Sequence, residues 1–150
     1  MIALDDFLAE LMPRIHEAEV AIHAGDANPR FAMWSHTDPV TVLGAKWNAI
    51  GWREVEPMFE LLAAGFSGCT SCEWEVIAAE VGVDMAYIAA IERTTASLGD
   101  QLPDSYALRS TTILRREGDE WKIVHRHGSP YDDRAAPLLA QLDDPSSRPP

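Results

Sequence analysis

The chain of 150 residues is long enough for one domain with a substantial core, and its 47% hydrophobic and 24% charged residues are typical of a globular protein. Its 24 acidic residues against 12 basic ones give a net charge of −12, which argues against nucleic acid and anionic membrane as partners. No apolar run reaches the roughly 18 residues of a membrane span, and the acidic N-terminus lacks the basic region of a signal peptide, so we expect a cytoplasmic protein.

The first part of the chain has helical periodicity. Residues 4–22 place apolar side chains three or four positions apart, which predicts an amphipathic helix. Pro13 should kink this helix or shift its start, because proline cannot donate the helical hydrogen bond. Asn28 and Pro29 are typical of a helix cap and a first turn, so we expect a short second helix through Trp34.

A brief strand and a longer helix follow. The segment PVTVLGA, residues 39–45, is rich in β-branched residues and predicts a strand. Residues 44–51 are expected to form a loop that carries Trp47. From Gly51 onward, apolar and aromatic residues again recur at helical spacing, and residues 67–69 should end this helix.

The chain after Cys69 is rich in strand-forming residues and predicts an antiparallel sheet. The connections at residues 82–84, 98–104 and 118–119 are too short for a crossover, so neighbouring strands must be antiparallel. Four strands are expected, within TSCEWEVIAAEVG, DMAYIAAIERTTAS, SYALRSTTILRRE and EWKIVHRHG. Helices followed by a strand meander indicate an α+β fold, with the helices packed on one face of a curved sheet.

The two cysteines favour neither a metal nor a redox site. Cys69 and Cys72 form a single C-x-x-C, without the second pair that a zinc site would need and without the strand–helix context of a thioredoxin-type motif. We therefore expect reduced, half-buried thiols and no metal. The chain also has no Gly-rich phosphate loop or nucleotide-binding fingerprint, so no cofactor is expected.

The order of the elements and several motifs resemble a known family. The order is similar to that of the cone-shaped nuclear-transport-factor-2-like fold, and the motifs resemble its SnoaL-like, ketosteroid-isomerase-related branch. The motifs are MWSHTDPVTVLGA, GWREVEPMFE, AYIAAIER and LRSTTILRREGDEWKIVHRHGSP. The last of them also resembles the association domain of calcium/calmodulin-dependent protein kinase, which shares the fold. The resemblance covers about residues 5–130, so we expect one domain over residues 1–133, followed by a helical turn and a disordered tail over residues 134–150.

The resemblance implies a fold more than an activity. Proteins of this fold include isomerases, dehydratases, cyclases, hydrolases and non-catalytic assembly domains, so the residues of the site, and not the fold, determine the function. The fold implies a concave face that encloses a pocket under the helices and a convex face that commonly forms a homodimer. We therefore expect a small hydrophobic or carboxylate-bearing molecule and a second copy of the chain as partners.

Alternation along the last strand predicts which of its side chains share a face. The two expected sets are Trp121, Ile123, His125 and His127 on one face, and Lys122, Val124 and Arg126 on the other. A two-residue hairpin loop at residues 118–119 would fix the register with the preceding strand. Thr112 would then lie opposite His125. Ser110 would lie opposite His127.

Arginines and one carboxylate are the candidate pocket residues. The resemblance to the kinase association domain implies that Arg109, Thr111 and Arg126 lie on the concave face and bind ligand, with the histidines on the convex face. Glu92 interrupts an otherwise apolar run, and a buried carboxylate needs a partner or a raised pKa, so Arg109 and Arg126 are its natural partners. Such a cluster could transfer protons or bind an anionic group of a substrate. The alternative is an ion-pair network that only holds the strands together.

The His-x-His pair of the last strand has three interpretations. The Cα atoms of His125 and His127 should lie about 7 Å apart, given the roughly 3.3 Å rise per residue, which permits a shared metal but leaves it without a third ligand. His127 is a candidate acid–base group, since an imidazole titrates near neutral pH. Structural hydrogen bonds, to Thr112 or Ser110 or across a dimer, are the alternative.

Four residues are candidates for the mouth of the pocket. Trp34, His36 and Asp38 lie where the short helix meets the first strand, a region that lines the pocket mouth in the SnoaL-like branch. Trp34 could form the wall there, and His36 or Asp38 could act as an acid or base. Asp38 before Pro39 could equally form a turn, since Asp-Pro is a turn signal. Trp47 lies on a loop that could close over the pocket or simply pack.

Two functions follow from these residues. The first is a cofactor-free isomerase, dehydratase or cyclase that transfers protons on a small hydrophobic molecule, with Glu92 as the acid–base group and His36 or His127 assisting. Arg109 and Arg126 would orient the substrate. The second is a non-catalytic ligand-binding or association domain. The carboxylate–tyrosine–carboxylate trio of ketosteroid isomerases cannot be assigned in this sequence, so both functions stay open.

Overall fold

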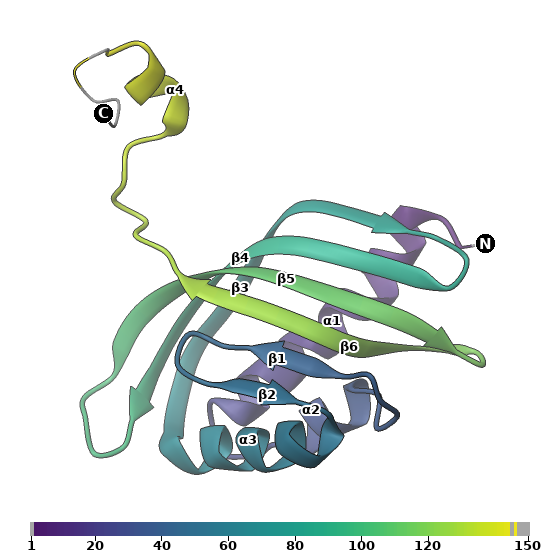
Figure 1. Ribbon diagram of the computed structural model, residues 1–150. Helices are drawn as coiled ribbons and strands as arrows, with labels where there is room; N and C mark the ends of the chain where they lie inside the picture. Colours follow the sequence, from purple (N-terminus) through teal and green to yellow (C-terminus); the bar gives the residue numbers. More distant parts are fainter. Residues whose placement is uncertain (1, 145, 147–150) are drawn as a thin grey trace.

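The computed structural model describes residues 2–144 and 146, and it has the expected α+β architecture, with helices packed on a strongly curved sheet (Figure 1). The helices are α1 (Leu4–Ile22), α2 (Asn28–Met33), α3 (Trp52–Gly65) and α4 (Leu138–Leu142). The strands are β1 (Thr41–Leu43), β2 (Asn48–Ile50), β3 (Phe66–Val81), β4 (Met85–Leu98), β5 (Asp104–Glu117) and β6 (Glu120–Pro130).

The six strands form one sheet in the order β2-β1-β6-β5-β4-β3. All neighbouring strands are antiparallel except β1 and β6, which run parallel. The predicted meander of four strands is therefore confirmed, and the short β1–β2 hairpin extends it at the β6 edge. In Figure 1, α1 runs behind the sheet while α2 and α3 lie beneath β1 and β2, so the sheet and helices form a cone.

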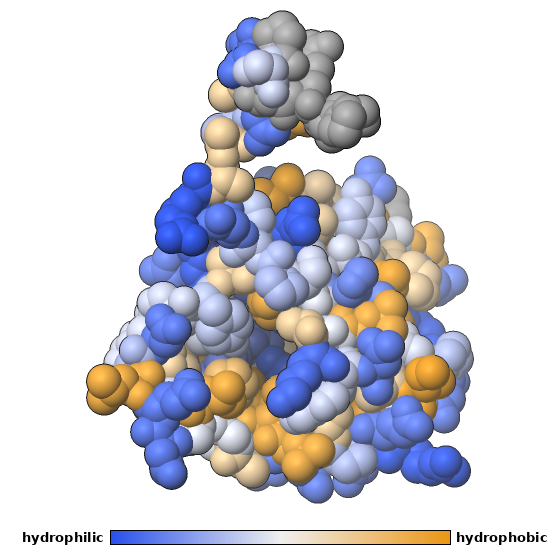
Figure 2. Space-filling view, turned by 60° about the vertical axis from the view of Figure 1, so that its left-hand side comes forward, coloured by the Kyte–Doolittle hydropathy of each residue, from blue (hydrophilic) through white to orange (hydrophobic). Residues whose placement is uncertain are grey.

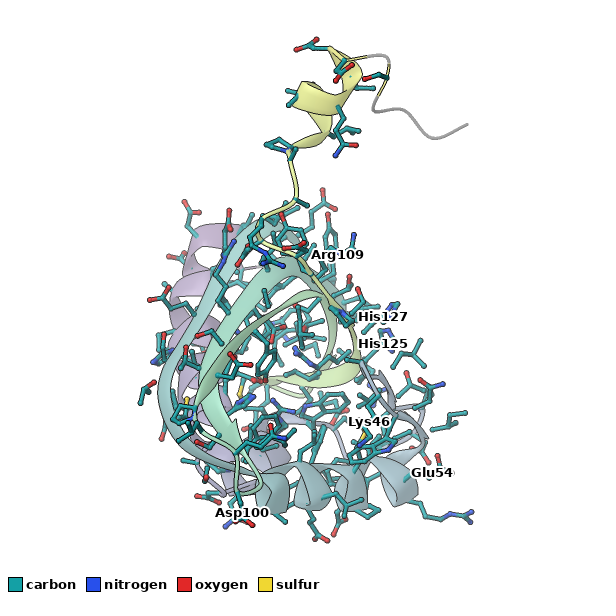
Figure 3. All side chains as sticks on the ribbon, turned by 90° about the vertical axis from the view of Figure 1, so that its left-hand side faces the viewer. Lys46, Glu54, Asp100, Arg109, His125 and His127 are labelled. Carbon is teal, nitrogen blue, oxygen red and sulfur yellow. The ribbon has the colours of Figure 1, made fainter. Side chains whose placement is uncertain are left out.

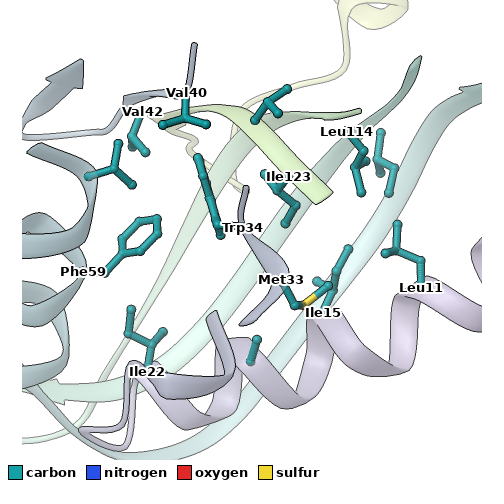
Figure 4. Close-up of a cluster of buried hydrophobic side chains, with 14 of the residues drawn as sticks. Leu11, Ile15, Ile22, Met33, Trp34, Val40, Val42, Phe59, Leu114 and Ile123 are labelled. Carbon is teal, nitrogen blue, oxygen red and sulfur yellow. The ribbon is translucent and has the colours of Figure 1, made fainter. Parts of the chain in front are cut away.

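The core lies between the concave face of the sheet and the three N-terminal helices. Figure 4 shows Trp34 in its centre, where its ring contacts that of Phe59 edge-on with a centroid distance of 5.0 Å. Phe7 of α1 contacts Trp121 of β6 in the same way, at 5.4 Å. Further buried members are Leu11, Ile15, Ile22, Met33, Val40, Val42, Val55, Ile88, Leu114 and Ile123.

The helices match the periodicity of the sequence. The buried apolar side chains of α1 are spaced three or four residues apart, as its amphipathic pattern predicts. Pro13 lies inside α1 rather than at its start, so the expected shift of the helix start is not seen. In α2, Pro29 occupies the first turn, where its missing N–H leaves no hydrogen bond unmade.

Two boundaries differ from the sequence prediction. Residues 44–51 were expected to be a loop, but Asn48–Ile50 form β2 and pair with β1. Three residues are too few for the alternation that identifies a strand, and the pairing with β1 is what creates this one. At the other boundary, β3 begins at Phe66 directly after α3, because its first residues pair with the end of β4.

A β-bulge in β6 changes which side chains share a face. The predicted two-residue turn is confirmed, with Glu117 opposite Glu120. Val124 is then an extra residue, because Leu114 pairs with Ile123 while the preceding β5 residue pairs with His125. The bulge reverses the alternation from that point onward. The expected pairing of Thr112 and Ser110 with the two histidines is therefore wrong: Thr112 faces Arg126 and Ser110 faces Gly128. Ile123 and Arg126 face the core, and His125 and His127 face outward.

The C-terminal segment leaves the cone at the end of β6. Two nitrogens of the Arg93 guanidinium, Nε and Nη2, donate to Asp133 over 2.9 and 2.8 Å and hold the start of this segment against the sheet. The helical turn expected in AAPLLAQL is present as α4, which stands away from the cone in Figure 1. The tail expected to be disordered falls largely on residues 145 and 147–150, outside the described residues. Within the described range, none of the helices has the length and apolar character that a membrane span requires.

Candidate functional site

The concave face of the sheet encloses a cavity of about 470 Å³ with α1 and α3. Its rim is formed by the β1–β2 hairpin and the β4–β5 loop, and Figure 2 shows the opening as a hollow beside exposed hydrophobic side chains. Most of the wall is apolar and is made by Ile22, Val42, Met58, Phe59, Leu62, Phe66, Ala96, Leu98, Leu102, Ala107, Leu108 and Pro130. A cavity of this size and lining is typical of a small-molecule site.

A buried ion pair lies at the inner end of the cavity. Glu92 of β4 accepts two hydrogen bonds from the guanidinium of Arg126 on β6, each 2.6 Å long. Their side chains are only 5% and 13% exposed. Burial alone would lower the pKa of Arg126, but the carboxylates of Glu92 and Glu19 raise it above its usual value. Of the two arginines expected beside Glu92, the structure brings Arg126 to it and not Arg109.

A second buried ion pair borders the same end of the cavity. Arg30 of α2 donates a hydrogen bond to Glu19 of α1 at 2.5 Å, and both side chains are less than 10% exposed. Burial alone would raise the pKa of Glu19, but the positive charges of Arg30 and Arg126 lower it below its usual value. Two carboxylates and two guanidinium groups therefore balance one another at the base of the pocket.

A histidine and a tyrosine form a hydrogen-bonded pair in the cavity wall. His23, the residue after α1, lies with its Nε2 atom 2.5 Å from the Tyr106 hydroxyl of β5. Its Nδ1 atom is 2.7 Å from the backbone carbonyl oxygen of Glu19. Burial lowers the pKa of His23 and raises that of Tyr106 to about 12. Both groups are therefore neutral near pH 7.

The thiol nearest to this pair is unreactive. The Cys72 sulfur lies 3.9 Å from Nδ1 of His23 and 3.5 Å from the Thr94 hydroxyl. Burial raises the pKa of Cys72 to about 12, so the thiolate that nucleophilic chemistry requires is not formed at neutral pH. Cys69 is half-buried, and both cysteines are free thiols.

The comparison with protein families agrees with this fold. A profile of the SnoaL-like domain matches residues 9–133. The chain belongs to the SnoaL-like domain family. No curated protein matches it.

Solved structures of nuclear-transport-factor-2-like proteins share the fold of this SnoaL-like domain. A candidate dehydratase from Streptomyces avermitilis is 19% identical, with a TM-score of 0.71 over 86% of this chain and 99% of the other. A superfamily member from Salmonella enterica is 17% identical, with a TM-score of 0.73 over 89% and 96% of the two chains. A candidate calcium/calmodulin-dependent kinase association domain from Thiobacillus denitrificans is 20% identical, with a TM-score of 0.61 over 77% and 90%. At these identities the similarity establishes the fold alone.

Three of the expected site residues of this SnoaL-like domain lie outside the pocket, on the convex face. Arg109 and Thr111 are exposed there and alternate with inward-facing residues of β5, so their expected concave position is wrong. Arg109 lies over the ring of Tyr131 instead. His127 is also exposed, and Figure 3 shows it with Arg109 and His125 at the outer edge of the cone. His125 is hydrogen-bonded to the Thr41 hydroxyl at 2.7 Å.

Of the four residues expected at the pocket mouth, one lines the pocket and three do not. Trp47 lines the rim from the β1–β2 hairpin. Trp34 is a core residue, only 2% exposed. His36 stacks on the ring of Trp52 at 4.0 Å. Asp38 accepts a hydrogen bond from the backbone N–H of Trp52 at 2.8 Å, which agrees with the turn-and-cap interpretation.

Four polar residues that line the cavity were not predicted from the sequence: Glu19, His23, Arg30 and Tyr106. Glu19 carried a local signal, since it lies on the apolar side of the predicted helix, and His23 follows it by four residues, directly after the helix end. Tyr106 carried none, because its partner lies 83 positions earlier in the chain. Only the curvature of the sheet brings these two residues together.

Proposed function

We propose that this SnoaL-like domain binds a small, uncharged, largely apolar molecule in the cavity of the cone. The observation that carries the proposal is the cavity itself, about 470 Å³ in volume, walled by apolar side chains and closed at its inner end by buried polar groups. Apolar walls supply binding energy through burial, and a few polar groups fix the orientation of a ligand.

The charges at the inner end of the cavity favour an uncharged ligand. Arg126 and Arg30, the arginines in the cavity wall, are each bound to a buried carboxylate. A carboxylate-bearing ligand would have to displace Glu92 from Arg126 and leave that side chain buried without a partner, which is costly. The net charge of −12 also repels anions at a distance. The carboxylate-bearing ligand expected from the sequence is therefore the alternative, and an experiment must distinguish it from an uncharged ligand.

Catalysis by Glu92 has less support than its position suggests. The carboxylate does face the cavity, but both of its oxygens accept hydrogen bonds from Arg126. Each oxygen keeps a second lone pair, but the two-point bond to Arg126 fixes the orientation of the carboxylate, so it cannot turn toward the proton that a general base removes. We assign to Glu92 the role of holding Arg126 in place. The candidate dehydratase among the structural neighbours supports an enzymatic use of this fold, and at 19% identity it does not extend to particular residues.

Titration with N-phenyl-1-naphthylamine, an uncharged apolar fluorophore, tests the proposal. We expect saturable binding by the natural chain and at least about tenfold weaker binding by Ala96→Phe, because the added ring costs the ligand about 1.4 kcal/mol or more of contact. Ala64→Phe, at an exposed position of α3, is the matched control and should bind like the natural chain. Equal binding by all three proteins would refute the proposed site.

Competition with a matched pair of ligands separates the two classes. Octan-1-ol and octanoate have chains of equal length and differ in charge. We expect octan-1-ol to displace the fluorophore at lower concentration than octanoate. The opposite order would establish the carboxylate alternative.

Self-association through the convex face is a second candidate function. Ile77, Met85 and Tyr87 lie on this face, and the first two are 59% and 47% exposed. Large exposed apolar side chains that lie together are typical of interfaces between subunits. We expect a homodimer in analytical ultracentrifugation and a monomer after Tyr87→Arg. A natural chain that sediments as a monomer at all concentrations would contradict this function.

A further inference from the structure

We propose that His125 and His127 bind a divalent transition metal ion, with Zn²⁺ as the best match, and that the same two residues of a second copy of the chain complete the site. The inference goes beyond the ligand cavity, since both histidines lie on the convex face. It rests on the second candidate function, self-association through that face, and it assigns to this association a metal ion that holds the two copies together.

Two imidazole rings point outward together from β6. Arg126 faces the core, so the residues on either side of it, His125 and His127, lie on the convex side of the sheet. His125 is half-buried and His127 is exposed, and Figure 3 shows both at the outer edge of the cone. Residues two apart in a strand have Cα atoms about 7 Å apart, at roughly 3.3 Å per residue. Two imidazoles at this spacing can bind one metal ion.

The hydrogen bond of His125 prepares its second ring nitrogen for a metal ion. The Thr41 hydroxyl of β1 lies 2.7 Å from Nδ1 of His125. When this hydroxyl accepts the Nδ1 hydrogen, the lone pair of the neutral ring is on Nε2. Metal-binding histidines generally donate their other nitrogen to an oxygen in this way, which fixes the ring and its tautomer. Burial lowers the pKa of His125, and the proximity of His127 lowers it further, so this ring is neutral near pH 7.

One chain supplies only half of a zinc site. Structural Zn²⁺ sites have four ligands in a tetrahedron, and the pair provides two. Among the described residues, no group of three or more histidines, cysteines or acidic residues is placed to hold a metal ion. The neighbours of His127 in the sheet are Thr111 on β5 and Leu43 on β1, which offer no imidazole, thiol or carboxylate. The missing ligands therefore have to come from another molecule.

A second copy of the chain can supply them by symmetry. β6 is one of the two central strands of the six-stranded sheet. In the strand register, His125 is in line with Ile113 of β5 and Tyr87 of β4, so the pair belongs to the same face as the apolar residues of the expected interface. Two copies related by a two-fold axis present the same patch to one another. An axis beside His127 would bring four imidazoles together, a ligand set that suits tetrahedral Zn²⁺.

The charges of the molecule favour a bound cation between two copies. Each chain carries a net charge of −12, which attracts cations and makes two copies repel one another. A shared dication reduces this repulsion. Arg109 is the arginine of β5 that pairs with Ser129, two residues beyond His127, and its guanidinium lies over the ring of Tyr131 at 5.9 Å.

Sedimentation with either ZnCl2 or EDTA tests the inference directly. We expect zinc to shift the natural chain toward the dimer, with one Zn²⁺ bound per two chains in equilibrium dialysis. His127→Gln removes a ligand at an exposed position, so it should bind Zn²⁺ about tenfold more weakly or worse and should not respond to zinc in sedimentation. His16→Gln, exposed on α1, is the matched control and should behave like the natural chain.

Two further measurements distinguish this site from zinc bound loosely at the surface. Thr41→Val keeps both imidazoles and removes the hydroxyl, and we expect it to weaken zinc binding by about tenfold. Unchanged affinity in Thr41→Val would overturn the assignment of Nε2 of His125 as a ligand. Co²⁺ bound in place of Zn²⁺ should show the strong visible absorption of a tetrahedral ion. The pale spectrum of six-coordinate Co²⁺ would overturn the four-histidine site.

The remaining outcomes separate the metal site from self-association. One Zn²⁺ per chain without a change in sedimentation would overturn the shared site, and so would zinc binding that His127→Gln leaves unchanged. A dimer that forms equally with zinc and with EDTA would overturn the metal site and leave self-association through the convex face intact. A chain that stays monomeric in both conditions would refute both proposals.

Discussion

Glu92 and Arg93 are consecutive residues of β4 that lie on opposite faces of the sheet, and each forms a two-point ion pair. Glu92 binds Arg126 inside the cone, where the two side chains are 5% and 13% exposed. Arg93 binds Asp133 and Glu75 outside it, where its side chain is 39% exposed. The geometry is similar in both places, with N–O distances from 2.6 to 2.9 Å.

The two ion pairs differ in how far water screens and solvates their charges. On the convex face, solvent screens the charges of Arg93 and solvates each partner when the pair opens, so the pair contributes little to stability. Inside the cone, a charge that loses its partner has nothing to replace it. The inner pair is therefore a fixed part of the pocket, whereas the outer pair is a tether for the C-terminal segment.

The largest effect should come from breaking the inner pair. Glu92→Met leaves the Arg126 guanidinium buried and unpaired, and we expect it to lower the free energy of unfolding by about 3 to 5 kcal/mol. The double variant Glu92→Met/Arg126→Met removes both charges and should recover most of that loss. Urea denaturation measures both. Equal losses in the single and double variants would contradict the account.

A smaller effect should appear in the pH dependence of stability. This dependence comes from His23, which lies beside the buried ion pairs at the base of the pocket. Burial holds the pKa of folded His23 below the value of 6.5 of the free side chain, so the unfolded chain binds more protons and stability falls as the pH decreases through and below that value. Glu19, Arg30 and Arg126 act on this imidazole, and Cys72 and Tyr106 contact it.

We expect His23→Gln to lose less stability than the natural chain between pH 7.5 and pH 5 in urea denaturation, because glutamine does not titrate. His16→Gln, exposed on α1, should keep the natural pH dependence. An identical loss in His23→Gln and the natural chain would contradict the assignment of a buried neutral imidazole.

The smallest effect should come from the outer pair. Arg93→Met removes both of its ion pairs, yet each former partner remains accessible to water, so the urea midpoint should stay close to that of the natural chain. Protection of residues near Asp133 from proteolysis should decrease, since the tether is lost. A loss of stability as large as that of Glu92→Met would show that solvent exposure does not determine how much each ion pair contributes to stability.

The sequence predicted the architecture because the fold depends on repeated local patterns. The spacing of apolar residues in 4–22 and the turn at residues 118–119 recur with enough regularity to be read directly, and the structure has both. The motifs of the SnoaL-like branch identified the family that the family profile also matches. These features persist even where single residues vary.

The site was predicted only in part because it depends on irregularities and on distant contacts. Glu92, Arg126 and Trp47 line the cavity as expected. Arg109 and Thr111 do not, because one extra residue at Val124 reverses the relation between β5 and the end of β6. The alternation of apolar and polar residues along a strand does not reveal such a bulge in the sequence. His23 and Tyr106 meet only because the sheet curves over α1, so neither residue could be paired from the sequence.

A crystal structure of the complex with N-phenyl-1-naphthylamine would show whether the cavity is the binding site. We expect the aromatic rings to lie between the apolar walls of the cavity, with Glu92 and Arg126 still paired. A ligand bound on the convex face, or bound in the cavity with Glu92 displaced from Arg126, would contradict the proposed binding mode.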